Sequence, residues 1–257
     1  MIRAAGVVWV VVLVLATAPG RAADLTAEQV RAALAASRSD RSTDLSGKSL
    51  ENLDLSNLDF RHADLSGANL YGAKLDGADF SGANLSAAKL DLAWIIRANF
   101  TNANLSNASL FGPVVSSGLE NSPAEAPVFT GANFSGARII ARLSRFNLEG
   151  ANFTGAKMGA DMKNQSMGLM RTDLSGADLS GSNFTDADLG RALMRFANLT
   201  GATLRGADLT GADLSGADLT RADLTGANLT EADLGSTSLA NVRGLDMVKG
   251  FNPPKSR

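Results

Sequence analysis

The chain lacks cysteine altogether. This absence excludes disulfide bonds, a thiol nucleophile, thiolate metal ligands and a lipid-modified cysteine anchor. Histidine occurs once, as His62, in an otherwise ordinary stretch of the chain, and we do not expect it to act as a catalytic acid or base. The sequence also offers no arrangement typical of a catalytic triad. We therefore predict that the protein is not an enzyme and that it holds no cofactor or metal.

Neither sign of charge is in large excess. The 24 lysine and arginine residues stand against 26 aspartate and glutamate residues, for a formal net charge of -2. Electrostatic binding to nucleic acid needs a stripe of basic residues that neutralises phosphates, and the sequence contains no such stripe. We therefore predict no nucleic-acid partner.

Long apolar runs are missing except at the N-terminus. Arg3 precedes an uncharged stretch from 4 to 20, and small residues then suit cleavage after Ala22 or after Ala18. The stretch is shorter than the roughly 20 apolar residues of a membrane-spanning helix. It predicts a cleaved secretory signal over 1–22, with an uncleaved anchor as the alternative. Cleavage after Ala22 would leave no stable membrane span and a mildly acidic protein, secreted into a bacterial periplasm.

The dominant pattern in the rest of the chain is a repeat of five residues. Alanine recurs two positions before a leucine or phenylalanine, as in the unit Ala207-Asp208-Leu209-Thr210-Gly211. We call the large apolar residue the centre of each unit. Centres run without a slip from Leu45 to Leu110 and from Leu174 to Leu239. A helix repeats its apolar positions every three or four residues and a strand every two, so a period of five indicates a solenoid with short sides.

Phenylalanine indicates how many units make one coil. Phe60, Phe80 and Phe100 are the phenylalanine centres of the first block, and they lie 20 residues apart. With four units per coil, such residues stack at the roughly 4.8 Å spacing of paired strands. We expect Phe134 and Phe153 to stack in the same way. The alanines would face a narrow interior, and the polar residues would form the outer corners.

The repeat carries a family resemblance. Units such as Ala68-Asn69-Leu70, Ala78-Asp79-Phe80 and Ala222-Asp223-Leu224 follow the pattern Ala-(Asp/Asn)-(Leu/Phe). In this the chain resembles the pentapeptide-repeat family over roughly residues 43 to 241. The resemblance implies an all-β solenoid, the right-handed four-sided parallel β-helix. It also leaves open a homodimer formed through terminal coils.

Two further functions have to be weighed against a binding scaffold. The resemblance implies, as one alternative, a cytoplasmic DNA mimic that inhibits or protects a type II topoisomerase, but the secretory signal and the arginines interspersed among the acids oppose it. The other alternative is a secreted β-helix enzyme that acts on polysaccharides. Uniform coils of 20 residues leave a smooth prism without the groove that such an enzyme needs.

The two ends of the repeat each need a cap, because an open solenoid end exposes core side chains and unpaired strand groups. Residues 26 to 37 predict a short helix, with Thr26 and Gln29 as a capping box and Val30 and Leu34 as its apolar stripe. At the other end we expect Met247, Val248 and Phe251 to cover the last coil. The predicted organisation is a signal peptide (1–22), a capping segment with a short helix (23–42), a first repeat block (43–112), a loop insertion (113–128), a second repeat block (129–241), and a C-terminal cap and tail (242–257).

Interruptions of the repeat distinguish this chain from a uniform solenoid, and the largest interruption is the loop insertion. It is rich in proline and without periodicity. Just before it, apolar residues replace the usual outward polar ones and create an apolar patch, which either the loop or a partner covers. The predicted partner-binding residues are Leu92, Trp94, Ile96, Pro113, Glu120, Pro123, Glu125 and Pro127.

Smaller irregularities follow the loop. The step from Ile139 to Leu143 is one residue short, and between Met158 and Leu169 the register is lost among several methionines, which we interpret as filling of an irregular core. Leu193 and Phe196 make a second outward apolar spot. The sequence as a whole predicts a secreted, non-enzymatic scaffold that binds an unknown protein partner.

Overall fold

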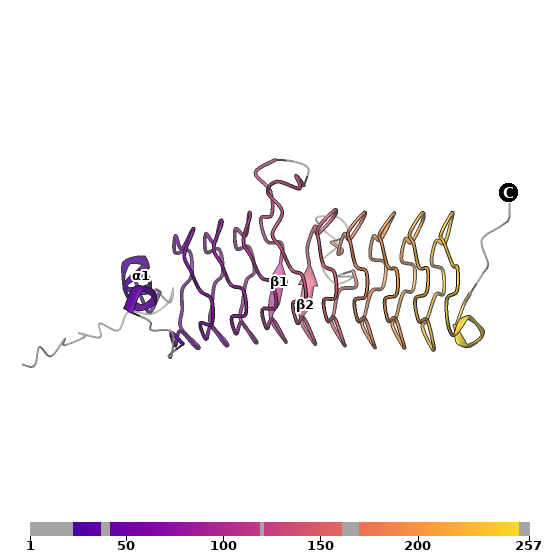
Figure 1. The fold of residues 1–257 in the computed structure, drawn as a ribbon, viewed down its shortest axis with the longest axis horizontal. Coiled ribbons are helices and arrows are strands. Elements are labelled where there is room, and N and C mark those ends of the chain that lie inside the picture. The colour runs from indigo at the N-terminus through magenta and orange to yellow at the C-terminus, as the bar shows by residue number, and fades with distance from the viewer. Residues whose placement is uncertain (1–22, 37–41, 119–120, 161–169, 252–257) are drawn as a thin grey trace, which may run out of the picture.

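The computed structural model describes residues 23–36, 42–118, 121–160 and 170–251, which form one elongated rod (Figure 1). Helix α1 (Ala27–Ala36) lies at the N-terminal end, and a short 3-10 helix, η2 (Leu245–Met247), lies at the C-terminal end. Strands β1 (Ser109–Phe111) and β2 (Arg138–Ile140) pair in parallel near the middle. The predicted signal peptide lies outside the described residues.

Single-residue parallel bridges hold most of the rod together. They join each unit to the unit one coil further on, and in the regular parts the bridged residues are 20 positions apart. Each coil therefore has four faces, which we number by their N-terminal centres: Leu45 for the first, Leu50 for the second, Leu55 for the third and Phe60 for the fourth. The prediction of a right-handed four-sided parallel β-helix is confirmed.

Each five-residue unit folds by two kinds of backbone hydrogen bond. The inward alanine donates to the carbonyl of the preceding centre, as Ala212 does to Leu209 at 2.9 Å, and this bond closes the corner. The centre donates to the next coil, as Leu214 does to Asp233 at 2.8 Å, and this bond is a rung of the ladder. Gly211 takes the corner position with φ of 64°, in the left-handed region that glycine enters at little cost. Both Ala212 and Leu214 are fully buried.

Phenylalanine rings stack along the core as the spacing predicts. On the fourth face the ring centroids of Phe60 and Phe80 lie 4.7 Å apart, and those of Phe80 and Phe100 lie 5.0 Å apart, with nearly parallel planes. On the first face Phe134 and Phe153 stack at 5.1 Å. The predicted four-unit coil is thus visible in the packing of its largest side chains.

Two more phenylalanines extend these columns. Phe129 stacks 5.0 Å beyond Phe100, and Phe184 stacks 4.7 Å beyond Phe153. Phe129 also contacts Phe134 at 5.3 Å with its plane tilted by 60°. The tilted contact joins the fourth-face column to the first-face column, so that aromatic packing continues past the insertion.

Helix α1 covers the first coil, as expected. The backbone N–H of Thr26 donates to Gln29 Oε1 at 2.7 Å, and that of Gln29 donates to Thr26 Oγ1 at 3.2 Å, which confirms the capping box. Val30 is fully buried against the core. Asp24 accepts a hydrogen bond from the backbone N–H of Ser49 at 2.7 Å, so the capping segment also satisfies backbone groups of the first coil.

The C-terminal cap differs from the expectation in one residue. Val248 and Phe251 pack against the core together with Leu245. Met247, in contrast, is 61% exposed and does not cover the last coil. It lies within η2, whose single turn directs Leu245 rather than Met247 toward the core.

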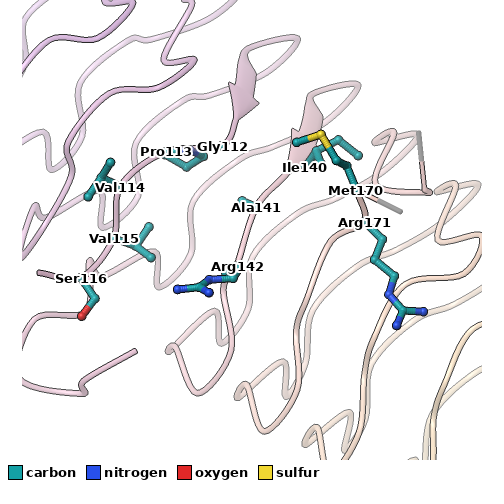
Figure 2. A pocket seen from close by; sticks show the side chains of 10 residues that line it. All are labelled: Gly112, Pro113, Val114, Val115, Ser116, Ile140, Ala141, Arg142, Met170 and Arg171. Atoms are coloured by element: carbon teal, nitrogen blue, oxygen red, sulfur yellow. The ribbon is translucent and has the colours of Figure 1, made fainter. Parts of the chain in front are cut away.

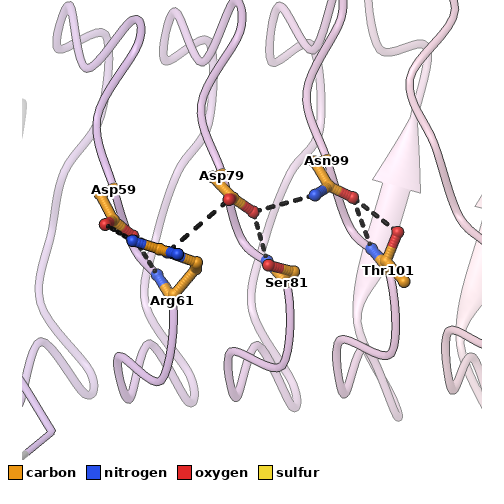
Figure 3. A network of polar contacts seen from close by, with 6 residues as sticks. All are labelled: Asp59, Arg61, Asp79, Ser81, Asn99 and Thr101. Carbon is orange, nitrogen blue, oxygen red and sulfur yellow. Dashed lines mark hydrogen bonds and ion pairs between the residues drawn. The ribbon is translucent and has the colours of Figure 1, made fainter. Parts of the chain in front are cut away.

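Outward polar side chains form ladders of their own along the rod. On the fourth face Asp79 Oδ1 accepts hydrogen bonds from the backbone N–H of Ser81 at 2.9 Å and from Asn99 Nδ2 at 3.1 Å (Figure 3). Arg61, one coil earlier, pairs with Asp59 at 2.6 Å and reaches Asp79 at 3.8 Å. These outward acids are therefore bound in structural contacts.

The longest described ladder runs along the first face. Each amide donates from Nδ2 to the oxygen one coil before it, at distances of 3.0 to 3.2 Å, so every member except the last accepts from the amide one coil after it. Each oxygen also accepts a backbone N–H at its own corner. The members are Asp64, Asn84, Asn104, Asn133 and Asn152.

We expect Asn104→Asp to destabilise the rod. The change removes the donor to Asn84 Oδ1 and brings two acceptor oxygens together, which should lower the free energy of unfolding by about 1–2 kcal/mol. Denaturant unfolding measures the loss. The matched control is Asn107→Asp, which adds the same charge three residues along the chain, at a corner outside this ladder. Equal stability of the two variants would contradict a structural role for the ladder.

Candidate functional site

The first interruption is shorter than the sequence suggests. Val114 bridges Trp94, and Val115 is buried in the core, so the coil continues through these residues. The ladder resumes where Arg97 donates to the carbonyl of Glu125 at 2.8 Å, and Val128 bridges Asn99. The predicted loop of 113–128 is therefore corrected to residues 117–124, which we call the insertion loop. The part of it that the structure describes projects from the side of the rod (Figure 1).

Three of the predicted contact residues are buried. Pro113 and Pro127 stand at inward positions, where the repeat normally has alanine, and neither is available to a partner. Proline fits there because the inward residue uses its N–H only for the corner bond and contributes no rung to the ladder. Ile96 is also buried, at 6% exposure. Glu120 lies outside the described residues, and Pro123 is exposed.

Glu125 closes the base of the insertion loop. Its Oε2 accepts hydrogen bonds from Ser116 Oγ and from the backbone N–H of Ser117, both at 2.8 Å, and its Oε1 accepts from Ser117 Oγ at 2.6 Å. The hydrogen bonds from Ser117, followed by that from Ser116, lower the pKa of Glu125 to about 2. The predicted contact residue Glu125 therefore has a structural role at the base of the insertion loop.

Asn121 ties the loop to the next coil. Its Nδ2 donates to the carbonyl of Arg142 at 3.1 Å, to the carbonyl of Ser144 at 3.2 Å and to Ser144 Oγ at 3.0 Å. In a regular coil these carbonyls would accept backbone N–H groups of the preceding coil. A side chain of the loop thus replaces rungs of the ladder.

A pocket opens where those rungs are missing. It lies between the coil that carries Val114 and the coil that carries Arg142, on the third face (Figure 2). The pocket has a volume of about 410 Å³. Its lining residues are Gly112, Pro113, Val114, Val115, Ser116, Ile140, Ala141, Arg142, Met170 and Arg171.

A short step between two centres of the later coil lies beside the pocket. Ile139 and Leu143 are both buried centres, yet they are four residues apart, so this corner has one residue fewer than the corner beneath it. Gly112 still donates to the carbonyl of Ile140 at 2.9 Å, but no bridge joins Val114 to Arg142. The coil that is one residue short at this corner is thus the coil that makes no bridge to Val114 on the third face.

The apolar patch before the pocket stays partly open. Trp94 is 43% exposed and Leu92 is 41% exposed. Gly112 lies against Leu92, and Val114 stands one coil beyond Trp94, so these two residues flank the patch without burying it. Tyr71 and Phe196 are also exposed, and Phe196 more so than the other large apolar residues of the described chain.

The second interruption is described only at its ends. Met158 is a buried centre of the second face, and Met170 lines the pocket. Met162 and Met167 lie outside the described residues. Within the described ranges, no group of three or more histidine, aspartate or glutamate side chains could hold a metal ion, and no helix there is long and apolar enough to cross a membrane.

Comparison with known proteins identifies the family. The family model for pentapeptide repeats matches the chain in eight copies, over residues 41–72, 63–102, 78–112, 172–211, 197–235 and 207–243. These ranges cover more than half of the chain, which therefore belongs to the pentapeptide-repeat family. No curated protein matches the chain.

Several solved structures are similar to this chain. HetL, a pentapeptide repeat protein involved in heterocyst differentiation regulation from the cyanobacterium Nostoc sp. strain PCC 7120, is 28% identical over 89% of this chain and 99% of its own, with a TM-score of 0.39. QnrB1, a plasmid-mediated fluoroquinolone resistance protein, is 21% identical over 76% of this chain and 92% of its own, with a TM-score of 0.41. A pentapeptide repeat protein of the Arabidopsis thaliana thylakoid lumen is 33% identical over 45% of this chain and 65% of its own, with a TM-score of 0.26.

The base of the insertion loop should withstand mild acid. Because the folded pKa of Glu125 lies below its ordinary value of 4.5, its contribution to stability is complete above that value and disappears as the pH falls through about 2. Carbon NMR of the Glu125 carboxyl group should give a midpoint near 2, and Ser117→Ala should raise it. A midpoint near 4.5 in the unmodified chain would contradict the hydrogen bonds described here.

Proposed function

We propose that the protein is a secreted, non-enzymatic scaffold that binds a partner protein through the third face of its rod. One observation supports this proposal. The insertion loop, the short step from Ile139 to Leu143 and the extra residues between Met158 and Leu174 all occur at a corner of the third face. The irregularities of the repeat are therefore concentrated on one side of the molecule.

The other sides offer little for specific recognition. Along the first face the outward residues repeat the same few polar types and are engaged in a ladder. A partner that recognised such a face would bind in many equivalent registers along the rod. The third face is distinct because exposed aromatic residues interrupt it, and tryptophan is enriched among the residues that dominate binding energy.

The spacing of these aromatic residues favours a protein partner over a small ligand. Trp94 lies on the third face, and Phe196, 74% exposed, lies at its corner with the fourth face, four coils further on. At one strand spacing or more per coil, four steps correspond to about 20 Å or more. A protein surface spans this distance, and standard protein interfaces are broad enough to include both residues.

The topoisomerase alternative is less well supported. A mimic of DNA would need an extended acidic surface, whereas arginines pair with several of the outward acids, for example Arg205 with Asp223 at 3.2 Å and Arg195 with Asp213. The net charge of -2 and the predicted secretory signal point in the same direction. Inhibition of gyrase supercoiling by the purified protein, together with a cytoplasmic location in fractionated cells, would favour this alternative.

Photo-crosslinking in the native host tests the proposed face. A benzophenone amino acid at Trp94 or at Phe196 should capture the same partner protein, because both positions lie along one face. The matched control is Asn102, exposed at the corner between the fourth and first faces. Equal capture from all three positions, or capture from Asn102 alone, would contradict the proposal.

Removal of residues 117–125 provides a second variant. It brings Val115 and Phe129 back to the five-residue spacing, with Ala126 at the corner position, where Ala87 already adopts φ of 56°. The rod should keep its cooperative unfolding, measured by circular dichroism, while crosslinking from Trp94 falls. Undiminished crosslinking from Trp94 would exclude the insertion loop from the interface.

A further inference from the structure

We propose that the pocket on the third face binds an extended peptide segment of the partner, which pairs with the backbone of 113–115 and places an apolar side chain inside. This inference rests on the proposed function, since it assigns a binding mode to the same face. The inference is based on an interrupted ladder in which, among the described residues, the N–H of Val115 and the carbonyl of Pro113 form no hydrogen bond.

The backbone hydrogen bonds between the coils of Ile95 and Val114 are regular. They show which hydrogen bonds are missing between Val114 and the next coil. Ile95 donates from its backbone N–H to the carbonyl of Val114 at 2.9 Å, and Val114 donates to the carbonyl of Ala93 at 2.8 Å. By the same rule Val115 should donate to the next coil, and the carbonyl of Pro113 should accept from it. Among the described residues, neither group makes a hydrogen bond.

The gap between the coil of Val114 and the coil of Arg142 is fixed at both ends by backbone hydrogen bonds, so a small shift does not close it. Gly112 makes the last rung on one side, to Ile140, and Phe129 resumes the ladder at 3.3 Å to the carbonyl of Asn147 on the other. Asn121 already occupies the carbonyl of Arg142, which Val115 would otherwise use. The short step from Ile139 to Leu143 lies between these two anchors.

The unpaired groups have the geometry that a parallel strand recognises. The carbonyl of one residue and the N–H of the residue two positions on point to the same side of an extended chain, and a peptide strand pairs with such an edge through its own backbone. Pro113 and Val115 supply this pair. Main-chain hydrogen bonds would therefore align the peptide along the wall of the pocket.

The rest of the pocket selects the side chain. Val114, Ile140 and Met170 give it apolar walls, and its volume of about 410 Å³ falls within the usual range of ligand pockets. Arg142 and Arg171 are the charged residues of its lining (Figure 2). We expect a segment with an apolar centre and acidic flanks to bind this lining better than the same segment with lysine flanks.

Calorimetry and amide exchange with a defined peptide test the inference. The probe is acetyl-Glu-Val-Leu-Val-Glu-amide, and the same peptide with lysine at both ends is its control. The purified chain should bind the glutamate peptide at least about tenfold more tightly than the lysine peptide. At saturation, exchange of the Val115 amide should slow by about tenfold or more, while that of Ile95, already hydrogen-bonded, should not change.

A matched pair of variants separates the pocket from the rest of the face. Val114→Trp should fill the pocket and weaken the glutamate peptide about tenfold or more. The chain tolerates tryptophan in this column, since Trp94 stands one coil before. Leu193→Trp places the same side chain at an equivalent outward position of the third face, outside the pocket lining, and should leave the affinity unchanged.

Two outcomes would overturn the inference. One is no binding of the glutamate peptide at millimolar concentration, and the other is binding that leaves exchange at Val115 unaltered. Crosslinking from Trp94 and Phe196 that persists in Val114→Trp would keep the proposed face but remove the pocket from it. Peptide binding without crosslinking would instead remove the proposed partner face and leave the pocket as a peptide site.

Discussion

The structure depends on the close stacking of coils around a narrow interior. Each coil lies one strand spacing above the last, so every inward position meets its equivalents directly above and below. Alanine fits at most of these positions, and larger residues occur at the first coil, as Leu53 and Leu58, and beside the four-residue step, as Phe146. This constraint fixes the length of the unit, because one residue more or less alters the corner and shifts the ladder beyond it.

The same constraint explains where variation is allowed. Residues can be added or lost only at a corner, where the chain has already turned away from the core. In this molecule the changes gather at the two corners of the third face, while the fourth-face ladder crosses the insertion through the bridge between Asn99 and Val128. The rod thus remains continuous on one side and is opened on another. A repetitive scaffold acquires a distinct side in this way without losing its core.

The regular parts of this molecule could be predicted from the sequence. The spacing of Phe60, Phe80 and Phe100 was sufficient for the four-unit coil, and Thr26 with Gln29 was sufficient for the helix cap. The bounds of the insertion were harder to predict, because Pro113 and Pro127 resemble loop residues although they occupy inward positions of the coil. Only one feature of the sequence, the short step from Ile139 to Leu143, pointed indirectly to the pocket. A pentapeptide pattern reports which residues face inward, but it does not report whether two successive coils remain in contact.

Engineered disulfides test the central claim most directly, and the absence of native cysteine gives the measurement a clean background. Paired strands bring Cα atoms within the 4.4–6.8 Å that a disulfide requires. The variant with Asn99→Cys and Val128→Cys should oxidise readily, because these residues are bridged across the insertion on the fourth face. The variant with Val114→Cys and Arg142→Cys should remain reduced under the same conditions, because the ladder is open there. Equal oxidation of the two variants would show that the coils stay closed on the third face and would contradict the account.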